Sequence, residues 1–523
     1  MPIVSACVVV QLNEAYRSRD APALRSILRS ASVNHIRVLA NESRIDMENN
    51  VLEEIEDWKL EAKLERSERY FFHTKVTDRI SVGKKSFVIG RKGTGKTAIG
   101  EYLSTLNKNN CFAVKLSFKN FPFNLLYAQQ DISYTAPNQY VSVWKYLIYT
   151  SVCKLMSGNN GVDVETRSEL SKLFTQDIKN ALPNAVNEWT DYNFDVKVLG
   201  TGIGFGKNKK QQENSTNSIS ERVEALEGYI RGRLGDSTYL IIFDELDEDY
   251  KNMLEKDNYL KYTQLLTSLF KASQDVKSRF NEFRLYPVVF LRDDIYDVLQ
   301  DPDKTKWEDY RINLDWSREA LQNLLAFRIS RAIDPTGEIL PFAKAWGKIF
   351  KGGKVKYGNN QQSQMSSFDY ITRSTQNRPR DYIRYMQVCA EKALEKGESA
   401  ISPNIVKAQD KAFSNYLRSE LEDEIHGIIP EIREVLGVFS ALRKQTMSVE
   451  QFALQYGKAV DAGAIQKRDV NFVLEVLFIF SIIGNVPKQS NYHVFRYKNP
   501  DARLNFNENL CVHRGLFKAL QIL

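Results

Sequence analysis

An eight-residue stretch, residues 90–97, has the residue types that a phosphate-binding loop needs. It reads Gly-Arg-Lys-Gly-Thr-Gly-Lys-Thr and fits the pattern G-x-x-x-x-G-K-[ST]. Glycines let the backbone approach phosphates, while loop amides and the N-terminus of a following helix present positive charge to them. Lys96 is expected to reach the β- and γ-phosphates and Thr97 to hold a magnesium ion. The expected nucleotide contacts are Gly90, Arg91, Lys92, Gly93, Thr94, Gly95, Lys96, Thr97 and Ala98.

Two acidic residues, Asp244 and Glu245, directly follow the apolar run of residues 239–243. At the carboxyl end of a buried strand, Asp244 is expected to bind the magnesium ion through water. Glu245 is expected to act as the base, or as the group that orients the attacking water. Because a buried carboxylate is costly without a nearby cation, the pair predicts magnesium-dependent hydrolysis of a nucleotide. The guanine-reading pattern N-K-x-D does not follow the loop, which favours ATP over GTP.

Two arginines are candidates for contact with a terminal phosphate. Arg292 follows the apolar run of residues 285–291, so it is expected at the same edge of the sheet as the acidic pair. Arg380 lies at the start of an expected helix, where a proline suits the first turn, and Arg378 is the alternative choice. The structural alternatives are a surface ion pair of Arg292 with a neighbouring aspartate, and a capped surface helix around Arg380.

The surrounding sequence alternates short apolar runs with longer helical patterns. This alternation predicts an α/β fold with a parallel sheet covered by helices on both faces. With the loop of residues 90–97 the expected fold is that of a P-loop NTPase, and the family resemblance given below implies its ASCE/AAA+-like form. The expected strands are residues 86–89, 111–116, 238–243, 286–291 and 310–314. The first expected helix begins near residue 98. Further helices are expected at residues 140–156, 218–233 and 260–280.

The domain organisation follows from the change in pattern along the chain. We expect a helical N-terminal lead-in (1–75) and a P-loop ATPase core (76–315) with an insertion at about 160–217. A mainly helical pattern follows, in which the family resemblance given below implies a helical lid (316–425) and a winged-helix-like domain (426–523).

Composition limits the remaining functions. The 72 basic residues nearly balance the 65 acidic ones, so the net charge of +7 permits nucleic-acid binding without arguing for it. The five cysteines are scattered and indicate reduced thiols, without a disulfide framework or a zinc site. No apolar run has the length of a membrane span, and residues 3–12 lack the basic start of a signal peptide. A cytoplasmic protein that does not contact membranes is expected.

Four segments carry a family resemblance: residues 88–99 (VIGRKGTGKTAI), 241–247 (IIFDELD), 288–295 (VVFLRDDI) and 377–384 (NRPRDYIR). Together they resemble a bacterial P-loop ATPase family allied to the STAND and origin-recognition branches of the AAA+ class, often found in defence loci. The likeness runs from about residue 70 to the end of the chain. It implies that Arg292 and Arg380 correspond to the phosphate-sensing arginines called sensor 1 and sensor 2. It also implies a C-terminal winged helix, self-association controlled by nucleotide, and a switch-like role in antiphage defence.

The C-terminal region supports the winged helix in part. Residues 431–444, 448–457 and 469–483 have helical patterns, and residues 494–504 combine basic and aromatic side chains as a wing that contacts phosphates would. The third helix is nearly all apolar, whereas a helix that reads DNA exposes basic or amide side chains. Docking to a protein, or an autoinhibitory role, is therefore at least as well supported as DNA binding.

Three functions fit these observations. The first is a magnesium-dependent ATPase that acts as a switch, self-associates and controls a partner effector protein. The second is an origin-recognition-like ATPase that binds DNA through its C-terminal domain. The third is a scaffold that binds nucleotide without hydrolysing it. An arginine finger from a neighbouring subunit is also expected, and its candidates are Lys304, Lys306 and Arg311.

Overall fold

The structure is a computed structural model that describes residues 51–106, 110–131, 134–136, 138–174, 182–190, 219–249, 256–358, 361–488 and 492–522. The chain forms two compact units. One consists of residues 1–58, 325–371 and 383–412, and the other of residues 59–324, 372–382 and 413–523. Most of the expected N-terminal lead-in and most of the expected insertion lie outside the described residues. The second unit contains the whole of the candidate phosphate site.

The second unit is built on a five-stranded parallel sheet in the order β2-β3-β4-β1-β5. The fold class predicted from the sequence is confirmed by this sheet and by the helices on its two faces. The strands are β1 (Phe87–Ile89), β2 (Cys111–Ser117), β3 (Thr238–Asp244), β4 (Arg284–Leu291) and β5 (Arg311–Asn313). The strand β4 lies between β1, which precedes the phosphate loop, and β3, which carries the acidic pair.

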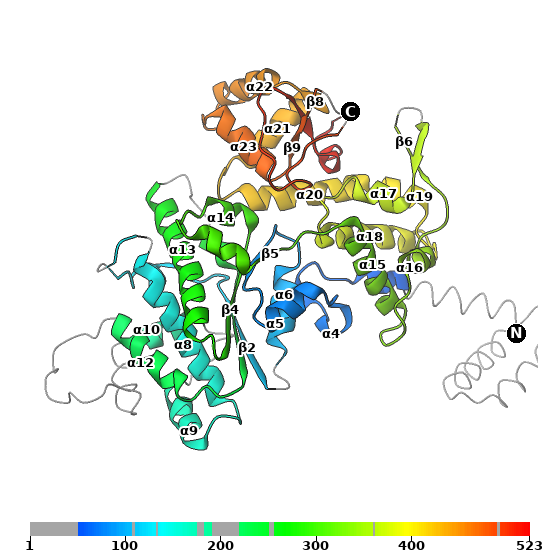
Figure 1. Ribbon diagram of the computed structural model, residues 1–523. Helices are drawn as coiled ribbons and strands as arrows, with labels where there is room; N and C mark the ends of the chain where they lie inside the picture. The colour runs from blue at the N-terminus through cyan, green and yellow to red at the C-terminus, as the bar shows by residue number, and fades with distance from the viewer. Residues whose placement is uncertain are drawn as a thin grey trace, which may run out of the picture. The chain divides into compact units, whose positions relative to one another are not determined.

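Both faces of the sheet are buried, which explains why its strands are continuously apolar. Alternate residues point to opposite faces: Ile241 and Phe243 belong to one hydrophobic cluster, Leu240 and Ile242 to the other. The helices α8 (Val141–Ser157), α12 (Ile219–Arg231) and α13 (Lys256–Arg279) cover one face, and α5 (Lys75–Ser81) and α6 (Lys96–Ser104) cover the other (Figure 1).

Shorter elements complete this part of the unit. They are η1 (Ala62–Leu64), α4 (Ser67–Tyr70), α7 (Asn124–Tyr127), η2 (Asn138–Tyr140), α9 (Val164–Leu173), α10 (Leu182–Thr190), η3 (Leu246–Asp249), α14 (Asp293–Val298) and η4 (Lys304–Asp309).

The first unit contains much of the helical region expected to form a lid. Its elements include α16 (Phe342–Ile349), β6 (Val355–Tyr357), β7 (Ser363–Met365) and α19 (Pro403–Ala408), together with parts of α15 (Arg318–Ile333), α17 (Ser367–Thr372) and α18 (Pro379–Glu395). Asp410 connects two helices of this unit, α17 and α18, because it accepts hydrogen bonds from the hydroxyls of Tyr370 (2.6 Å) and Tyr385 (2.8 Å). The guanidinium of Arg328 lies over the ring of Trp58, which links residues 51–58 to the helices of the same unit.

The C-terminal part of the second unit, residues 426–488 and 492–522, is called the C-terminal domain below. In these residues it has three α-helices and a small antiparallel sheet in the order β8-β10-β9. After α20 (Asp410–Ile425) come α21 (Ile432–Leu442), β8 (Thr446–Met447), α22 (Val449–Asp461), α23 (Val470–Ile479), β9 (Ile483–Val486), β10 (Asn509–Val512) and η6 (Arg514–Leu516). The helix α23 ends before the expected residue 483, because Ile483 starts β9. Its exposed residues are Asn471 and Glu475, in line with the expectation that it is mainly buried.

Candidate nucleotide-binding site

The predicted phosphate loop joins the end of β1 to the start of α6. Gly93 (φ +82°) and Gly95 (φ +99°) both adopt the left-handed backbone conformation, which is strained for other residues. At Gly93 a Cβ atom would also lie 3.1 Å from the Cβ of Arg380. The loop's backbone therefore favours glycine at positions 93 and 95, and the packing of Arg380 favours it further at Gly93.

Inside the loop, the Lys96 ammonium donates to the carbonyl oxygens of Gly90 (2.6 Å) and Arg91 (3.0 Å). Burial lowers the pKa of Lys96, while the nearby carboxylates of Asp247 and Asp293 oppose this effect. The ammonium is thus held by two neutral carbonyls in a half-buried position. Phosphate oxygens would be stronger acceptors for it, because they carry charge.

Asp244 is 2% exposed at the end of β3. Its Oδ1 accepts a hydrogen bond from the Glu245 amide at 3.0 Å, whereas its Oδ2 has no hydrogen-bond partner among the described residues. The Lys115 ammonium lies 3.7 Å from Oδ2. Burial raises the pKa of Asp244, and Lys115 counteracts part of this effect. A buried carboxylate oxygen without a donor is a suitable place for a cation.

A magnesium ion here would need oxygens from more than one source. Within the ranges that the structure describes, no group of three or more His, Cys, Asp and Glu side chains could hold a metal alone. Asp244 and Thr97, the second residue of α6, fit a shared role with the nucleotide's phosphates, since Mg²⁺ is commonly bound by one or two protein groups plus phosphate oxygens.

Glu245 is held by two residues that the sequence did not indicate. Its Oε2 accepts from the Lys63 ammonium at 2.7 Å and from the hydroxyl of Ser117. Glu245 also has φ +61°, in the left-handed region. Ser117 ends β2 and pairs with Asp244 in the sheet, so knowledge of the strand register would have identified it. Lys63, which belongs to η1, gave no signal in the sequence.

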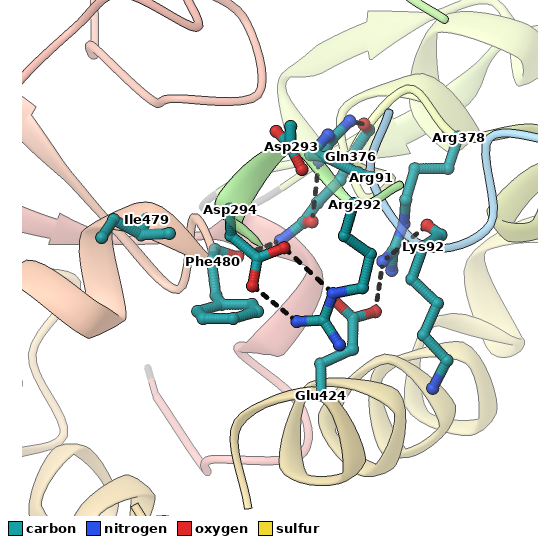
Figure 2. Close-up of a pocket in the computed structure, with 10 residues that line it drawn as sticks. All are labelled: Arg91, Lys92, Arg292, Asp293, Asp294, Gln376, Arg378, Glu424, Ile479 and Phe480. Carbon is teal, nitrogen blue, oxygen red and sulfur yellow. Dashed lines mark hydrogen bonds and ion pairs between the residues drawn. The ribbon is translucent and has the colours of Figure 1, made fainter. Parts of the chain in front are cut away.

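Arg292 is 8% exposed and lies at the end of β4, as expected. Its guanidinium forms two hydrogen bonds with Asp294, at 2.9 and 2.7 Å, and approaches Asp247 at 3.4 Å. An ion pair of Arg292 with a neighbouring aspartate is the alternative to phosphate contact that the sequence offers, and Asp294 is that aspartate. The pair is buried rather than on the surface, and it lies beside the phosphate loop (Figure 2).

The N-terminus of α18 packs against the phosphate loop. Arg378 is 1% exposed and binds Asp381 (3.1 Å) and Glu424 (2.8 Å). The Arg380 amide approaches the carbonyl oxygen of Gly93 at 3.4 Å, and its guanidinium pairs with Glu420 at 3.0 Å. Both candidate arginines are thus close to the loop, but the side chain of Arg380 is 22% exposed and has fewer partners.

The same region contains a link that the sequence analysis missed. Arg91 donates to the side-chain oxygen of Gln376 at 3.1 Å and to its carbonyl oxygen. The side-chain nitrogen Nε2 of Gln376 in turn donates to the carbonyl oxygens of Phe480 (3.1 Å) and Ser481 (3.2 Å) in the C-terminal domain. The Arg91 guanidinium also lies over the ring of Tyr497, 5.6 Å from its centre.

These contacts surround a pocket beside the phosphate loop, shown in Figure 2. Its lining comes from the loop, from the residue after β4 and the start of α14, from the turn before α18, from α20 and from the C-terminal domain. The lining residues are Arg91, Lys92, Arg292, Asp293, Asp294, Gln376, Arg378, Glu424, Ile479 and Phe480.

The three candidates for an arginine finger have partners within their own segment. Lys304 donates to the carbonyl oxygens of Tyr296 and Leu299, and Lys306 pairs with Asp303 at 2.7 Å. Arg311 pairs with Glu308 at 2.6 Å. These contacts do not distinguish which of the three residues is the finger.

Comparison with known proteins gives three kinds of similarity. A family model described as the FunZ-associated C-terminal helical domain matches residues 319–422. A transposon gamma-delta protein of 80.3 kDa from Escherichia coli (strain K12) is 22% identical over 475 residues, which are 83% of this chain and 62% of that protein. The chain therefore spans less than two thirds of the length of this relative.

Among solved structures, the chain is similar to the Orc1 protein of Aeropyrum pernix in complex with DNA (11% identity, 86% of this chain, 90% of that chain, TM-score 0.35). It is also similar to the Orc2 protein of Aeropyrum pernix in ADPNP–ADP complexes (12% identity, 85% and 90% coverage, TM-score 0.37). A third similar structure is Cdc6p of Pyrobaculum aerophilum (10% identity, 85% and 89% coverage, TM-score 0.28). With similarities this distant, the roles of the residues depend on the geometry of the site itself.

None of the helices in the described ranges is both long and apolar enough to cross a membrane.

Proposed function

We propose that this protein is a magnesium-dependent ATPase that acts as a nucleotide-controlled switch. The observation that carries the proposal is the link from Arg91 through Gln376 to the carbonyl oxygens of Phe480 and Ser481. It connects the phosphate loop to the C-terminal domain by direct hydrogen bonds. A change at the phosphates can therefore reach the C-terminal domain through only two side chains.

Nucleotide binding would begin at the loop. The amides of residues 93–98 and the N-terminus of α6 would bind the β- and γ-phosphates, and Lys96 would exchange its two carbonyl partners for phosphate oxygens. Thr97 and Asp244 would hold Mg²⁺, which, when bound, neutralises charge that develops on the phosphates. The Oδ2 of Asp244 supports this assignment, because it has no hydrogen-bond donor among the described residues.

Hydrolysis would use Glu245 as the acceptor of a proton from the attacking water. Arg292 and Arg380 would contact the γ-phosphate, with Arg378 as the alternative. Arg380 is favoured over Arg378 because its side chain, although paired with Glu420, is partly exposed. Loss of the γ-phosphate would return both arginines to their carboxylates, which is the two-state behaviour that a switch requires.

The output of the switch would be self-association and control of a partner effector protein, with antiphage defence as the biological setting. This part of the proposal extends the family resemblance of the four sequence segments. The buried C-terminal helix α23, whose exposed residues are Asn471 and Glu475, favours a protein partner.

A second candidate function is DNA binding by an origin-recognition-like ATPase. It is supported by exposed residues on the connection between β9 and β10, which includes Tyr492, Lys498 and Arg503. Binding by this wing alone would rest on phosphate contacts, so affinity should fall steeply as salt is raised. A protein that fails to bind duplex DNA at low salt would exclude this candidate.

Phosphate release and nucleotide binding together test the ATPase. We expect Lys96→Ala to weaken ATP binding by about 10- to 100-fold, since a hydrogen bond to a charged group contributes about 1.5–3 kcal/mol. Glu245→Gln should keep ATP binding and lose turnover. Lys261→Ala, an exposed residue of α13, is the matched control and should leave both unchanged. Turnover that survives in Glu245→Gln would contradict the assigned base, and binding without turnover in the native chain would indicate a scaffold.

The switch itself is tested by the mass of the native protein in solution. We expect different masses with ATP and with ADP, because self-association would follow the γ-phosphate. Equal masses with both nucleotides would contradict control of self-association by nucleotide.

A further inference from the structure

Lys63 forms a contact that the ATPase reaction does not require. Its ammonium lies 2.7 Å from Oε2 of Glu245 and 3.4 Å from the hydroxyl of Ser117. The side chains of Lys63 and Glu245 are 33% and 22% exposed. Lys63 belongs to η1, a short element that precedes the phosphate loop in the chain, and no motif of the nucleotide site includes it.

The order of the sheet shows in which direction this contact holds Glu245. Glu245 follows β3, whose two neighbours are β2 and β4. The phosphate loop follows β1, and Arg292 follows β4, so both lie on the β4 side of β3. Ser117 ends β2, on the opposite side. The Glu245 carboxylate is therefore bound on the side of β3 away from the strands that lead to the phosphate loop and to Arg292.

The backbone of Glu245 is consistent with a held position. Its φ of +61° is unfavourable for a residue with a side chain, so neighbouring contacts must maintain it. The available contacts are the Asp244 carboxylate, which accepts from the Glu245 amide, and the two donors Lys63 and Ser117. A carboxylate oxygen that already accepts from an ammonium and a hydroxyl is poorly placed to accept a proton from water near the γ-phosphate.

We propose that Lys63 is a positioning residue that keeps Glu245 disengaged, so that ATP hydrolysis requires the ion pair between them to open. This inference rests on the proposed function, because it regulates the base of that same reaction. It assigns to the segment ahead of the nucleotide core a restraining role on turnover. The alternative is an ordinary surface ion pair with no effect on the reaction.

The first experiment measures steady-state ATP hydrolysis by the full chain. We expect Lys63→Met to raise kcat and to leave KM unchanged, and Lys63→Arg to behave like the native protein because it keeps a donor. A partly exposed pair contributes up to about 1 kcal/mol, which corresponds to a rise of up to about fivefold in kcat. Ser117→Ala should change kcat in the same direction.

Lys351→Met is the matched control, because Lys351 forms a similar ion pair with Glu398 at 2.9 Å in the other unit. Its kcat should equal that of the native chain, and thermal melting should show that all variants are folded. A kcat that is unchanged or lower in Lys63→Met would overturn the proposal.

The second experiment does not depend on turnover. The reactivity of the Lys63 amine toward an amine-labelling reagent is measured by mass spectrometry, with and without a non-hydrolysable ATP analogue and Mg²⁺. We expect higher reactivity in Glu245→Gln and in the native chain with the analogue, while Lys351 stays constant. Equal Lys63 reactivity in the native chain and Glu245→Gln would overturn the proposal. If the native chain binds nucleotide but never hydrolyses it, the proposed ATPase function fails, and this labelling alone decides whether nucleotide releases Glu245.

Discussion

Arg91, in the phosphate loop, and Gln376, in the turn before α18, are joined by two hydrogen bonds, one of them 3.1 Å long. Gln376 is at the same time the donor to two carbonyl oxygens of the C-terminal domain. One amide side chain therefore contacts both the loop expected to bind ATP and the domain expected to respond to it. Several properties of the protein should depend on this arrangement and on the charged residues around it.

Replacement of Gln376 by methionine should separate the C-terminal domain from the phosphate loop. The carbonyl oxygens of Phe480 and Ser481 would lose their donor, at a cost of about 1–3 kcal/mol. Hydrogen exchange should become faster in β9, and the change in exchange that ATP causes there should become smaller. Gln455→Met, in α22 of the same domain, serves as control. An undiminished response of β9 to ATP in Gln376→Met would show that the coupling follows another route.

Replacement of Asp244 by asparagine should remove the effect of magnesium on nucleotide binding. We expect the apparent affinity for Mg²⁺ in the presence of ATP to fall by about 10- to 100-fold. Burial raises the pKa of Asp244 above its ordinary value, so protons compete with Mg²⁺ at a higher pH than at an exposed aspartate. In the native chain the effect of Mg²⁺ should weaken as the pH falls toward this raised pKa.

Titrations of nucleotide affinity against Mg²⁺ at several pH values provide the measurement. Asp236→Asn, on the surface, should match the native chain throughout. If Asp244→Asn responds to Mg²⁺ as strongly as the native chain, Asp244 is not a ligand.

Replacement of Arg378 and replacement of Arg380 should lower the free energy of unfolding by different amounts. Arg378→Met would leave Asp381 and Glu424 buried without their cation and should destabilise the fold by about 3–5 kcal/mol. Arg380→Met breaks a partly exposed pair with Glu420 and should cost about 1 kcal/mol or less.

Only Arg380→Met should reduce the preference for ATP over ADP while the protein stays folded. Chemical denaturation and nucleotide binding measure the two effects. Equal losses of stability in the two variants, or an unchanged ATP preference in Arg380→Met, would contradict the distinction.

His513 should make the C-terminal domain sensitive to acid. Burial lowers the pKa of His513 to about 3, and its Nδ1 accepts a hydrogen bond from the Gly515 amide at 3.1 Å. The folded-state pKa is below the unfolded value of about 6.5. The stabilising contribution of the neutral ring is therefore complete above about pH 6.5 and decreases by about 1.4 kcal/mol per pH unit as the pH falls below it.

His513→Asn keeps an acceptor near the Gly515 amide but does not titrate. Between pH 6.5 and 5.5, the free energy of unfolding of this variant should decrease less than that of the native chain. Denaturant titrations at pH 7.5, 6.5 and 5.5 measure the difference. Parallel pH profiles of the two proteins would show that His513 does not carry this dependence.

The local patterns of the sequence were sufficient to predict the loop of residues 90–97, the position of the acidic pair at a strand end, and the class of the fold. Each of these depends on neighbours along the chain: glycines for a left-handed loop, apolar runs for strands buried on both faces, and carboxylates at a strand end. The sequence could not predict the ion-pair partners of Arg292 and Arg378 beyond the adjacent aspartates. Glu424, for example, reaches Arg378 only because α20 passes the pocket.

The sequence by itself therefore determined which residues are the candidates for binding phosphate, holding a magnesium ion and accepting a proton. The tertiary structure decided what holds those residues. Lys63 lies 182 positions from Glu245, and Gln376 lies 285 positions from Arg91. Contacts over such separations leave no periodic or local signal, because they arise from the order of the strands and from the packing of α18 and the C-terminal domain on the loop. Only the fold shows that Glu245 is turned toward β2 and that the phosphate loop contacts the C-terminal domain.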